Sequence, residues 1–232
     1  MNAALTQALS HIRALHLHLP KRIANPIQSA VERAAARSPT ALSILYDTDK
    51  GPQRHCYTDS YRELIGPMRS KPITALEIGI DKGASLRLWR RFLPKATVVG
   101  IDIKRPATHL PGIEMHAGDQ SDENFLGDII DRYGGFDLVI DDGSHIASHI
   151  RASFDKLFPA LRPDGWYVIE DLWTAYHAGE YEGGPSGTPG TAIELIKGLI
   201  DRTQTESGAN DVAELHLFDS IVFIRKARPT TS

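Results

Sequence analysis

The chain lacks the features that mark several classes of protein. Cys56 is the only cysteine among its 232 residues, which excludes an internal disulfide framework and a cysteine-based zinc or iron–sulfur site. No apolar run approaches the roughly 20 residues of a membrane-spanning helix, and the N-terminal segment has no secretory signal pattern. The formal net charge of −3 gives no basic surface for nucleic acid. These absences favour a cytoplasmic protein with neither nucleic acid nor a membrane as its partner.

What is present is the composition of a folded chain. Hydrophobic residues make up 41% and charged residues 24% of the sequence, as in ordinary globular domains. A chain of 232 residues can bury most of the surface that it exposes when unfolded. We expect one main domain over 46–232, preceded by a helical extension over 1–45.

The N-terminal extension is basic. Glu32 is the only acid in residues 1–40, and Pro20 and Pro26 divide the segment into two predicted helices. Such helices can cover the main domain, join two copies as a homodimer, or lie on a membrane surface, and the short apolar stripe favours the packing roles. A further interpretation is a metal clip formed by His11, His16 and His18.

Residues 73–226 alternate between short apolar runs and helical stretches. We predict strands at 73–80, 97–103, 113–118, 136–142 and 165–171, and helices at 83–92, 122–133, 147–163 and 191–203. The last apolar stretch, 214–226, is interrupted at 218–220 and predicts a hairpin. The alternation predicts a Rossmann-like α/β fold with a mostly parallel seven-stranded sheet and a terminal antiparallel hairpin.

Ligands of such a sheet bind beyond the carboxyl ends of its strands. Gly79 and Gly83 follow the first strand and allow a tight turn close to a ligand. Asp102 ends the second strand, where a carboxylate can accept ribose hydroxyls. Asp119 and Gln120 follow the third strand, where they can contact an adenine edge, although Asp119 can also cap the next helix.

Taken together, these strand ends resemble those of the class I S-adenosylmethionine-dependent methyltransferases, over residues 73–226. The resemblance implies S-adenosylmethionine as cofactor, with Asp102 at its ribose and Asp119 and Gln120 beside its adenine. It also implies that the methionine pocket is formed around the first turn by Glu77, Gly79, Gly83 and Ser85.

Four acids follow the fourth and fifth strands: Asp141, Asp142, Glu170 and Asp171. Neighbouring parallel strands bring these carboxylates together, and their mutual repulsion is costly without a cation. Oxygen ligands suit Mg²⁺ or Mn²⁺ better than zinc or copper. We therefore predict a divalent-metal site, the alternative being helix capping with one salt bridge.

The segment that begins at Asp142, with the later acid pair, resembles the metal-dependent O-methyltransferases, including the catechol type. The resemblance implies that Asp142, Glu170 and Asp171 bind the metal and that His145 is the general base. Asp141 would then lie near the cofactor. The sequence leaves open whether Asp141 or Asp142 is the ligand, and whether His145 is merely structural.

The motif Asp-Asp-Gly-Ser-His at 141–145 and an upstream Thr-Asp-Lys-Gly at 48–51 narrow the resemblance to sugar O-methyltransferases. These act on macrolide deoxysugars, tetracenomycin rhamnose or mannosides, and this short chain is most similar to the compact mannoside enzymes of mycobacterial polymethylated polysaccharides. Lys50 would meet the cofactor's carboxylate, and Tyr57 would line the substrate entrance.

Aromatic residues follow the predicted metal ligands. Trp173, Tyr176 and His177 stand where their rings can stack on a sugar. The glycine-rich segment 178–191 comes next and can act as a lid over the substrate or as a mobile loop.

The sequence thus predicts a methyl transfer from S-adenosylmethionine to a hydroxyl of a mannoside or deoxysugar glycoside, a sugar or oligosaccharide substrate. A catechol or small-phenol O-methyltransferase is the alternative with the same cofactors. An NAD-dependent oxidoreductase is disfavoured because the chain has no Gly-x-Gly-x-x-Gly motif. A binding protein with a vestigial pocket is also disfavoured, because acids stand at both strand ends.

Overall fold

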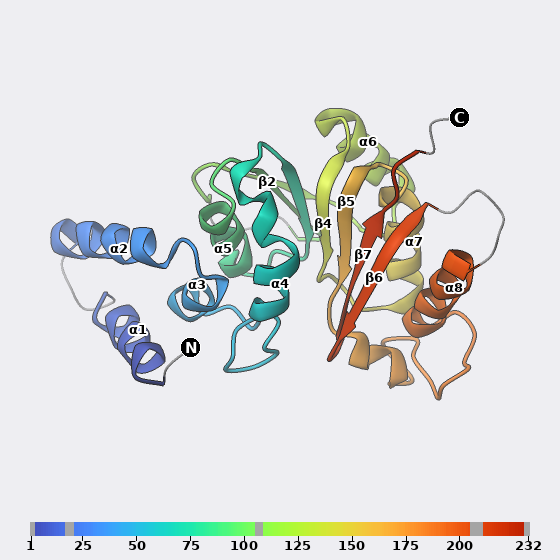
Figure 1. Cartoon of the computed structure of the whole chain (residues 1–232), viewed down its shortest axis with the longest axis horizontal. Coiled ribbons are helices and arrows are strands. Elements are labelled where there is room, and N and C mark those ends of the chain that lie inside the picture. Colours follow the sequence, from blue (N-terminus) through green and yellow to red (C-terminus); the bar gives the residue numbers. More distant parts are fainter. Residues whose placement is uncertain (1–2, 17–20, 105–108, 205–210, 230–232) are drawn as a thin grey trace. The chain divides into compact units, whose positions relative to one another are not determined.

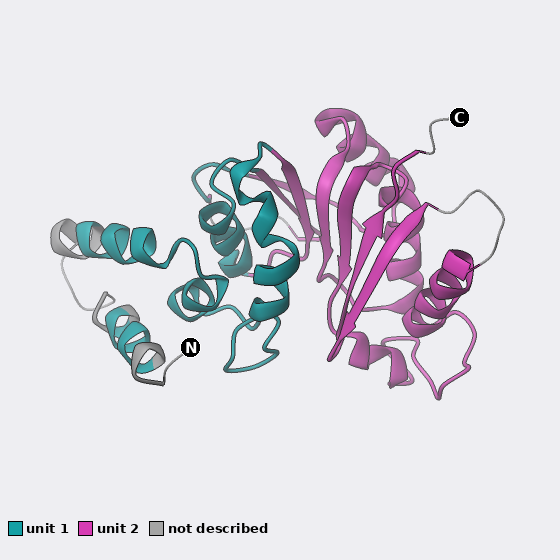
Figure 2. Cartoon of the chain, in the orientation of Figure 1, with its two compact units in different colours: residues 1–72, 82–96, 110–113 teal, residues 73–81, 97–109, 114–232 magenta. Residues whose placement is uncertain are grey.

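The computed structural model describes residues 3–16, 21–104, 109–204 and 211–229 (Figure 1). The chain divides into two compact units (Figure 2). The helical unit comprises 1–72, 82–96 and 110–113, and the sheet unit comprises 73–81, 97–109 and 114–232. The helical unit extends beyond residue 45, and the domain boundary expected at that residue stays a prediction.

The helical unit is built from five α-helices and one 3-10 helix in its described residues: α1 Ala3–His16, α2 Lys21–Ala35, α3 Pro39–Tyr46, α4 Thr58–Leu64, η1 Gly66–Ser70 and α5 Ala84–Phe92. Pro26 lies inside α2, so the predicted division at this residue is wrong. A proline's φ fits a helix, and the cost is one lost hydrogen bond and local crowding. Pro20 and His18 lie outside the described residues.

Helix α3 and the ring pair of Tyr61 and Trp89 form the core of the helical unit. Ser38 caps α3 by accepting a hydrogen bond from the Ala41 N–H at 3.1 Å, as a serine N-cap does. Leu42 is fully buried. The rings of Tyr61 and Trp89 are both buried, with their centroids 4.6 Å apart.

The sheet unit contains a seven-stranded sheet in the order β3-β2-β1-β4-β5-β7-β6. Its strands are β1 Thr74–Ile78, β2 Thr97–Asp102, β3 Ile113–Ala117, β4 Phe136–Asp141, β5 Leu161–Ile169, β6 Val212–Phe218 and β7 Ile221–Lys226. Strand β1 runs parallel to β2 and β4, and β4 runs parallel to β5, whereas β7 is antiparallel to β5 and β6. The terminal hairpin is confirmed. The strand order reverses between β1 and β4, which is where ligands of such sheets bind.

Helices α6 Glu123–Tyr133, α7 Ala147–Leu157 and α8 Ala192–Gln204 and the 3-10 helix η2 Leu172–Tyr176 complete the sheet unit. Alternate residues of β1 and β2 and of the end of β5 enter one apolar core, as strand geometry requires. Val139 of β4 and Ile169 of β5 pack there with Phe154 of α7. Asp122 caps α6 by accepting hydrogen bonds from the N–H groups of Asn124 and Phe125.

The boundary between α7 and β5 differs most from the prediction. The helix expected over 147–163 ends at Leu157, and β5 begins at Leu161. Pro159 accounts for this: Phe158 before it is still helical, with a φ of −63°, but a proline has no N–H with which to continue the helical hydrogen bonds.

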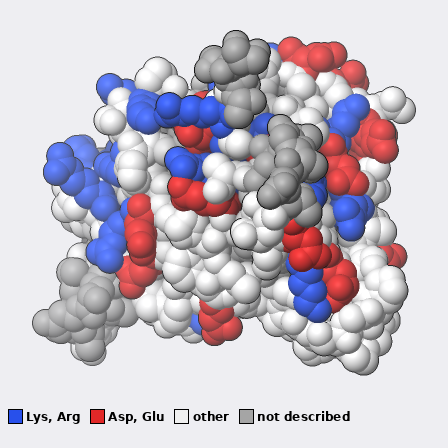
Figure 3. All heavy atoms as spheres, turned by 45° about the vertical axis from the view of Figure 1, so that its right-hand side comes forward, with Lys and Arg blue, Asp and Glu red and all other residues white. Residues whose placement is uncertain are grey.

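On the face shown in Figure 3, basic side chains lie beside acidic ones. Ion pairs of this kind also connect β5, β6 and β7: Arg225 pairs with Glu214 and lies 3.6 Å from Asp164, which also pairs with Arg228 at 2.6 Å. Among the described residues no helix has both the length and the apolar character needed to cross a membrane.

Candidate functional site

The carboxyl edge of the sheet is tightly packed where the strand order reverses. Gly79 follows β1 and Asp142 follows β4, and the N–H of Asp142 donates to the carbonyl of Ile78 at 3.0 Å. Gly79 has a φ of +93°, and a Cβ there would lie 2.0 Å from the Asp142 carbonyl oxygen. Glycine is therefore required for the two segments to pass this closely.

A cavity of about 300 Å³ lies at this edge of the sheet unit, at the lower end of the range for ligand pockets. Residues after β1, β2, β3 and β4 line it. Four of the predicted cofactor-binding residues are among them: Gly79, Asp102, Asp119 and Gln120. Glu77 is buried on β1 and is not among the lining residues.

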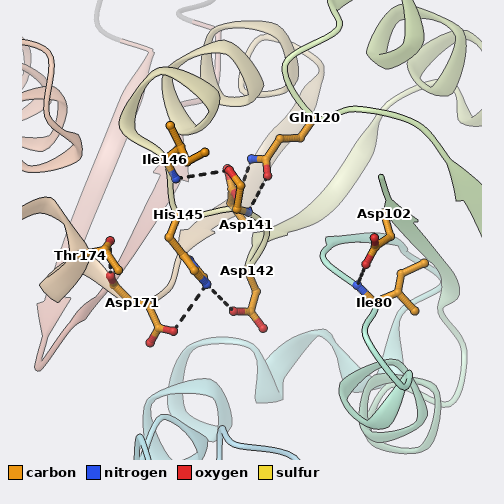
Figure 4. Close-up of polar contacts among 10 residues, drawn as sticks. Ile80, Asp102, Gln120, Asp141, Asp142, His145, Ile146, Asp171 and Thr174 are labelled. Atoms are coloured by element: carbon orange, nitrogen blue, oxygen red, sulfur yellow. Dashed lines mark hydrogen bonds and ion pairs between the residues drawn. The ribbon is translucent and has the colours of Figure 1, made fainter. Parts of the chain in front are cut away.

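The carboxylate of Asp102 organises the turn after β1 (Figure 4). Its Oδ2 accepts hydrogen bonds from the N–H groups of Ile80 at 2.8 Å and Asp81 at 3.3 Å, and its Oδ1 accepts one from Lys104 at 2.9 Å. A carboxylate offers about four acceptor positions, so the side chain retains capacity for one further donor in the cavity.

Gln120 connects the cavity to the segment after β4. Its Oε1 accepts a hydrogen bond from the Ser144 N–H at 2.8 Å, and its Nε2 donates to Asp141 Oδ1 at 3.2 Å (Figure 4). A Cβ on Gly143 would lie 2.1 Å from this Oε1. Asp119 accepts hydrogen bonds from the N–H and the hydroxyl of Ser121, which lower the pKa of Asp119.

Asp141 is enclosed in the sheet unit, with 2% of its surface exposed. The hydroxyls of Ser153 and Tyr167 donate to its Oδ2 at 2.6 and 3.1 Å. Burial raises the pKa of Asp141, and the hydrogen bonds from Ser153 and Tyr167 oppose this. Its two oxygens are thus used within the protein, and Asp141 is not among the cavity-lining residues.

Asp142, His145 and Asp171 form the one cluster of potential metal ligands that the described residues contain. Their ligand atoms lie within 4.8 Å of one another. The His145 Nε2 lies 3.7 Å from Asp171 Oδ2 and 4.0 Å from Asp142 Oδ1 (Figure 4). All three side chains are partly buried. Of the two adjacent aspartates, Asp142 belongs to this cluster and Asp141 does not.

Two members of the cluster have strained backbones. His145 has a φ of +58° and Asp171 a φ of +55°, in the left-handed region that non-glycine residues rarely adopt. The Asp171 carbonyl accepts hydrogen bonds from the N–H and hydroxyl of Thr174 at 3.0 and 2.7 Å. Such strain persists where surrounding contacts hold it, and it concentrates at functional sites.

Glu170, the third predicted metal ligand, is buried at the end of β5 and lies outside the cluster. Its N–H donates to the Asp141 carbonyl at 3.0 Å. Successive side chains of a strand point to opposite faces of the sheet. If β5 continued through Asp171, the side chains of Glu170 and Asp171 would therefore point to opposite faces, but the chain leaves the extended conformation at Asp171, whose φ is +55°.

The predicted substrate residues Trp173, Tyr176 and His177 follow the cluster on and after η2. Trp173 and Tyr176 are 43% and 50% exposed. The ring of Trp173 contacts those of His177 and Tyr181, at centroid distances of 4.9 and 5.9 Å. The turn between β6 and β7 supports η2, because Ser220 accepts hydrogen bonds from the N–H groups of Leu172 and Trp173.

The remaining predicted residues belong to the helical unit. Lys50 is fully buried, and Tyr57 is buried with its ring stacked on that of His55 at 5.2 Å. Gly83 has a φ of +72°, and α5 begins directly after it, with Ser85 in its first turn. Their roles toward the cofactor and substrate remain predictions.

The other cavity-lining residues were not predicted as site residues: Ile78, Ile101, Ile103, Gly118, Gly143, Ser144, Ile146 and His149. The hydroxyl of Ser144 and the Nδ1 of His149 are 3.0 Å apart. Ile103 is 68% exposed although apolar. In the sequence Ile103 fits the end of the predicted strand 97–103, and its exposure is known only from the structure. His149 is brought to the cavity by the first turn of α7.

No protein-family model matches the chain. It is 38% identical over 208 residues to mycinamicin VI 2''-O-methyltransferase of Micromonospora griseorubida, which covers 81% of this chain and 52% of that protein. It is 33% identical over 227 residues to 8-demethyl-8-alpha-L-rhamnosyl tetracenomycin-C 2'-O-methyltransferase of Streptomyces olivaceus, covering 87% of this chain and 60% of the relative.

A solved structure agrees. The MycE methyltransferase from the mycinamycin biosynthetic pathway, in complex with Mg, SAH and mycinamycin VI, superposes with a TM-score of 0.78 at 38% identity, over 83% of this chain and 54% of that one. The Rossmann-like methyltransferase fold and the resemblance to sugar O-methyltransferases are confirmed. The chain spans about half the length of the first of these relatives.

Proposed function

We propose that this chain, a relative of the O-methyltransferases that modify macrolide and tetracenomycin sugars, transfers a methyl group from S-adenosylmethionine to a sugar hydroxyl with the aid of a divalent cation. One observation carries the proposal: Asp142, His145 and Asp171 meet at the sheet edge that also holds the cavity. The same short segment after β4 supplies Asp142 and His145 to the cluster and Ser144 to the cavity. A methyl donor in the cavity and a sugar at the cluster would thus lie next to each other.

The donor set fits Mg²⁺ or Mn²⁺. Mg²⁺ sites commonly use one or two carboxylates and fill the remaining positions with water or substrate oxygens. Asp142 and Asp171 are two such carboxylates, and both flank the imidazole of His145. We propose Asp142 and Asp171 as the ligands, with Glu170 as the third ligand that the sequence pattern adds.

The cavity fits an S-adenosylmethionine cofactor. Gly79 and Gly143 both line it, so backbone without a side chain faces the ligand at these two positions. We propose that the remaining acceptor capacity of Asp102 binds a ribose hydroxyl and that Gln120, Asp119 and His149 surround the adenine. Lys50, Glu77, Gly83, Ser85 and Asp141 are kept as proposed contributors to cofactor binding from the sequence pattern.

When bound, the cofactor supplies an electrophilic methyl group and the cation favours the ionised form of a coordinated hydroxyl. His145 accepts the proton of the sugar hydroxyl at its Nε2, a task that suits a histidine near neutral pH. Asp171 and Asp142 lie 3.7 and 4.0 Å from this nitrogen and stabilise the imidazolium that results.

Trp173, Tyr176 and His177 would contact the sugar. Their exposed rings follow the cluster directly, and an aromatic face can stack on the apolar face of a sugar. Tyr57 is proposed at the substrate entrance. The relatives that act on glycosylated polyketides favour a sugar over a catechol, and both deoxysugar glycosides and mannosides belong to the proposed class. A homodimer and a cytoplasmic location complete the proposal.

The test is incubation of the purified protein with radiolabelled S-adenosylmethionine and a panel of deoxysugar glycosides, mannosides and catechols, with and without EDTA. We expect label in a glycoside and its loss on chelation, with recovery when Mg²⁺ is restored. Asp171→Asn should require more Mg²⁺ for half-maximal rate, whereas Asp201→Asn, an exposed acid on α8, should behave as wild type. Transfer that is indifferent to EDTA would remove the metal from the mechanism, and label in catechols alone would replace the sugar.

A further inference from the structure

The segment after η2 is fastened to helix α7 by a contact that the proposed reaction does not use. Helix α7 begins at Ala147, and its N-cap residue Ile146 makes no side-chain cap. The cap comes from 34 residues away, where Glu182 Oε2 accepts a hydrogen bond from the Ser148 N–H at 2.9 Å. The Tyr181 carbonyl accepts another from the Ala147 N–H at 3.1 Å. Two of the N–H groups that a helix leaves unpaired at its start are satisfied in this way.

The same segment is also fastened to η2, which follows Asp171. The N–H of Gly183 donates to the carbonyl of His177, and that of Gly184 donates to the carbonyl of Ala175, both at 3.0 Å. A Cβ on Gly183 would lie 2.5 Å from the carbonyl oxygens of Thr174 and His177. This side of the segment is therefore packed closely against η2.

Glu182 is held in a conformation that is unfavourable for it. Its φ of +54° lies in the left-handed region, which for a non-glycine residue costs energy and persists only when other contacts compensate. Hydrogen bonds from the side chain and N–H of Ser148 lower the pKa of Glu182. The side chain therefore acts as a charged acceptor, and a negative charge is favourable at the start of a helix.

We infer that Glu182 is a positioning residue, which ties segment 177–184 to the start of α7 and thereby holds the His145 turn beside the Asp171 turn. His145 lies two residues before α7, and Asp171 directly precedes η2. The tether spans these two elements, while the His145 Nε2 and Asp171 Oδ2 lie 3.7 Å apart. Glu182 itself belongs neither to the metal-ligand cluster nor to the cavity lining. The inference rests on the proposed function for the role of the cluster.

The experiment compares Glu182→Ala, Glu182→Gln and Glu180→Ala in the full chain. Glu180 is an exposed acid two residues away on the same segment, so its replacement controls for the loss of charge. Hydrogen exchange reports the Ser148 amide, and electron paramagnetic resonance of Mn²⁺ reports the affinity of the cluster. Neither readout requires turnover.

We expect Glu182→Ala to raise the exchange rate of the Ser148 amide about fivefold, the typical effect of losing a helix cap. We expect its Mn²⁺ affinity to fall about tenfold, at the low end of effects for groups that orient metal ligands. Glu182→Gln keeps an acceptor oxygen and should restore most of both properties. Glu180→Ala should change neither.

Unchanged exchange in Glu182→Ala would overturn the tether, and faster exchange with unchanged Mn²⁺ affinity would overturn its positioning role. An equal loss in Glu180→Ala would also overturn it, by assigning the effect to general charge. If the wild-type chain binds no Mn²⁺, the metal site of the proposed function fails, and the tether is then decided by the exchange of Ser148 alone.

Discussion

Replacing Gly79 with alanine tests the close approach of the two strand ends that hold the site. An alanine in the left-handed half of φ costs roughly 1–2 kcal/mol. The new Cβ would begin 2.0 Å from the Asp142 carbonyl oxygen, and relieving this overlap requires a displacement of about 1.4 Å, which in packed protein costs about 1–3 kcal/mol. The free energy of unfolding should therefore fall by about 2–5 kcal/mol.

For a chain of this length each kcal/mol lowers the melting temperature by about 2–4 °C. Gly79→Ala should therefore melt about 4–20 °C below wild type in thermal unfolding followed by circular dichroism. Because the displaced carbonyl belongs to Asp142, we also expect weaker Mn²⁺ binding, measured by electron paramagnetic resonance.

Gly187→Ala is the matched control. Gly187 has a φ of +91°, close to that of Gly79, but a Cβ there has no neighbour within 4 Å. In the control the free energy of unfolding should fall only by the cost of placing an alanine at a positive φ, about 1–2 kcal/mol. The control should bind Mn²⁺ as wild type does. Equal melting temperatures and equal Mn²⁺ affinities for the two variants would refute the reasoning.

Three further predictions concern single side chains. Ser153→Ala removes a donor to buried Asp141 and should lower the free energy of unfolding by about 1–3 kcal/mol in urea titrations; no change would mean that water replaces the hydroxyl. His145→Ala should reduce turnover about 10²- to 10⁴-fold while isothermal titration shows unchanged cofactor affinity, and a parallel loss of affinity would indicate a structural role. Burial lowers the pKa of His116 below 6.5, so the unfolded chain binds the proton first and stability falls as the pH drops below 6.5. His116→Gln should flatten this dependence, and an unchanged slope would assign it to other groups.

The sheet was predictable because its signals are local. Apolar runs such as Val98–Ile101 are buried on both faces and therefore stand out from their surroundings. The end of helix α7 at Leu157 could also have been predicted, because the sequence has a proline at position 159. What misled the prediction was the choice between two prolines, because helical spacing of apolar residues continues through Leu161.

The site was predictable as a set of strand ends, but not in its internal geometry. Asp141 and Asp142 are adjacent acids that the sequence cannot distinguish. The structure separates them because strand alternation turns Asp141 toward Ser153 and Tyr167, while Asp142 lies beyond the last residue of β4. The left-handed conformations of His145 and Asp171 carry no sequence signal, since both positions are non-glycine.

From the sequence alone came the order of strands and helices, the strand ends at which ligands bind, and the family resemblance, since each depends on residues close together along the chain. Only the tertiary structure decided which carboxylates meet His145, that Asp141 is enclosed, and that Glu182 caps a helix 34 residues away. Such contacts join residues that are far apart in the sequence and form only when the chain folds. In the sequence, Glu182 cannot be told apart from any other exposed glutamate.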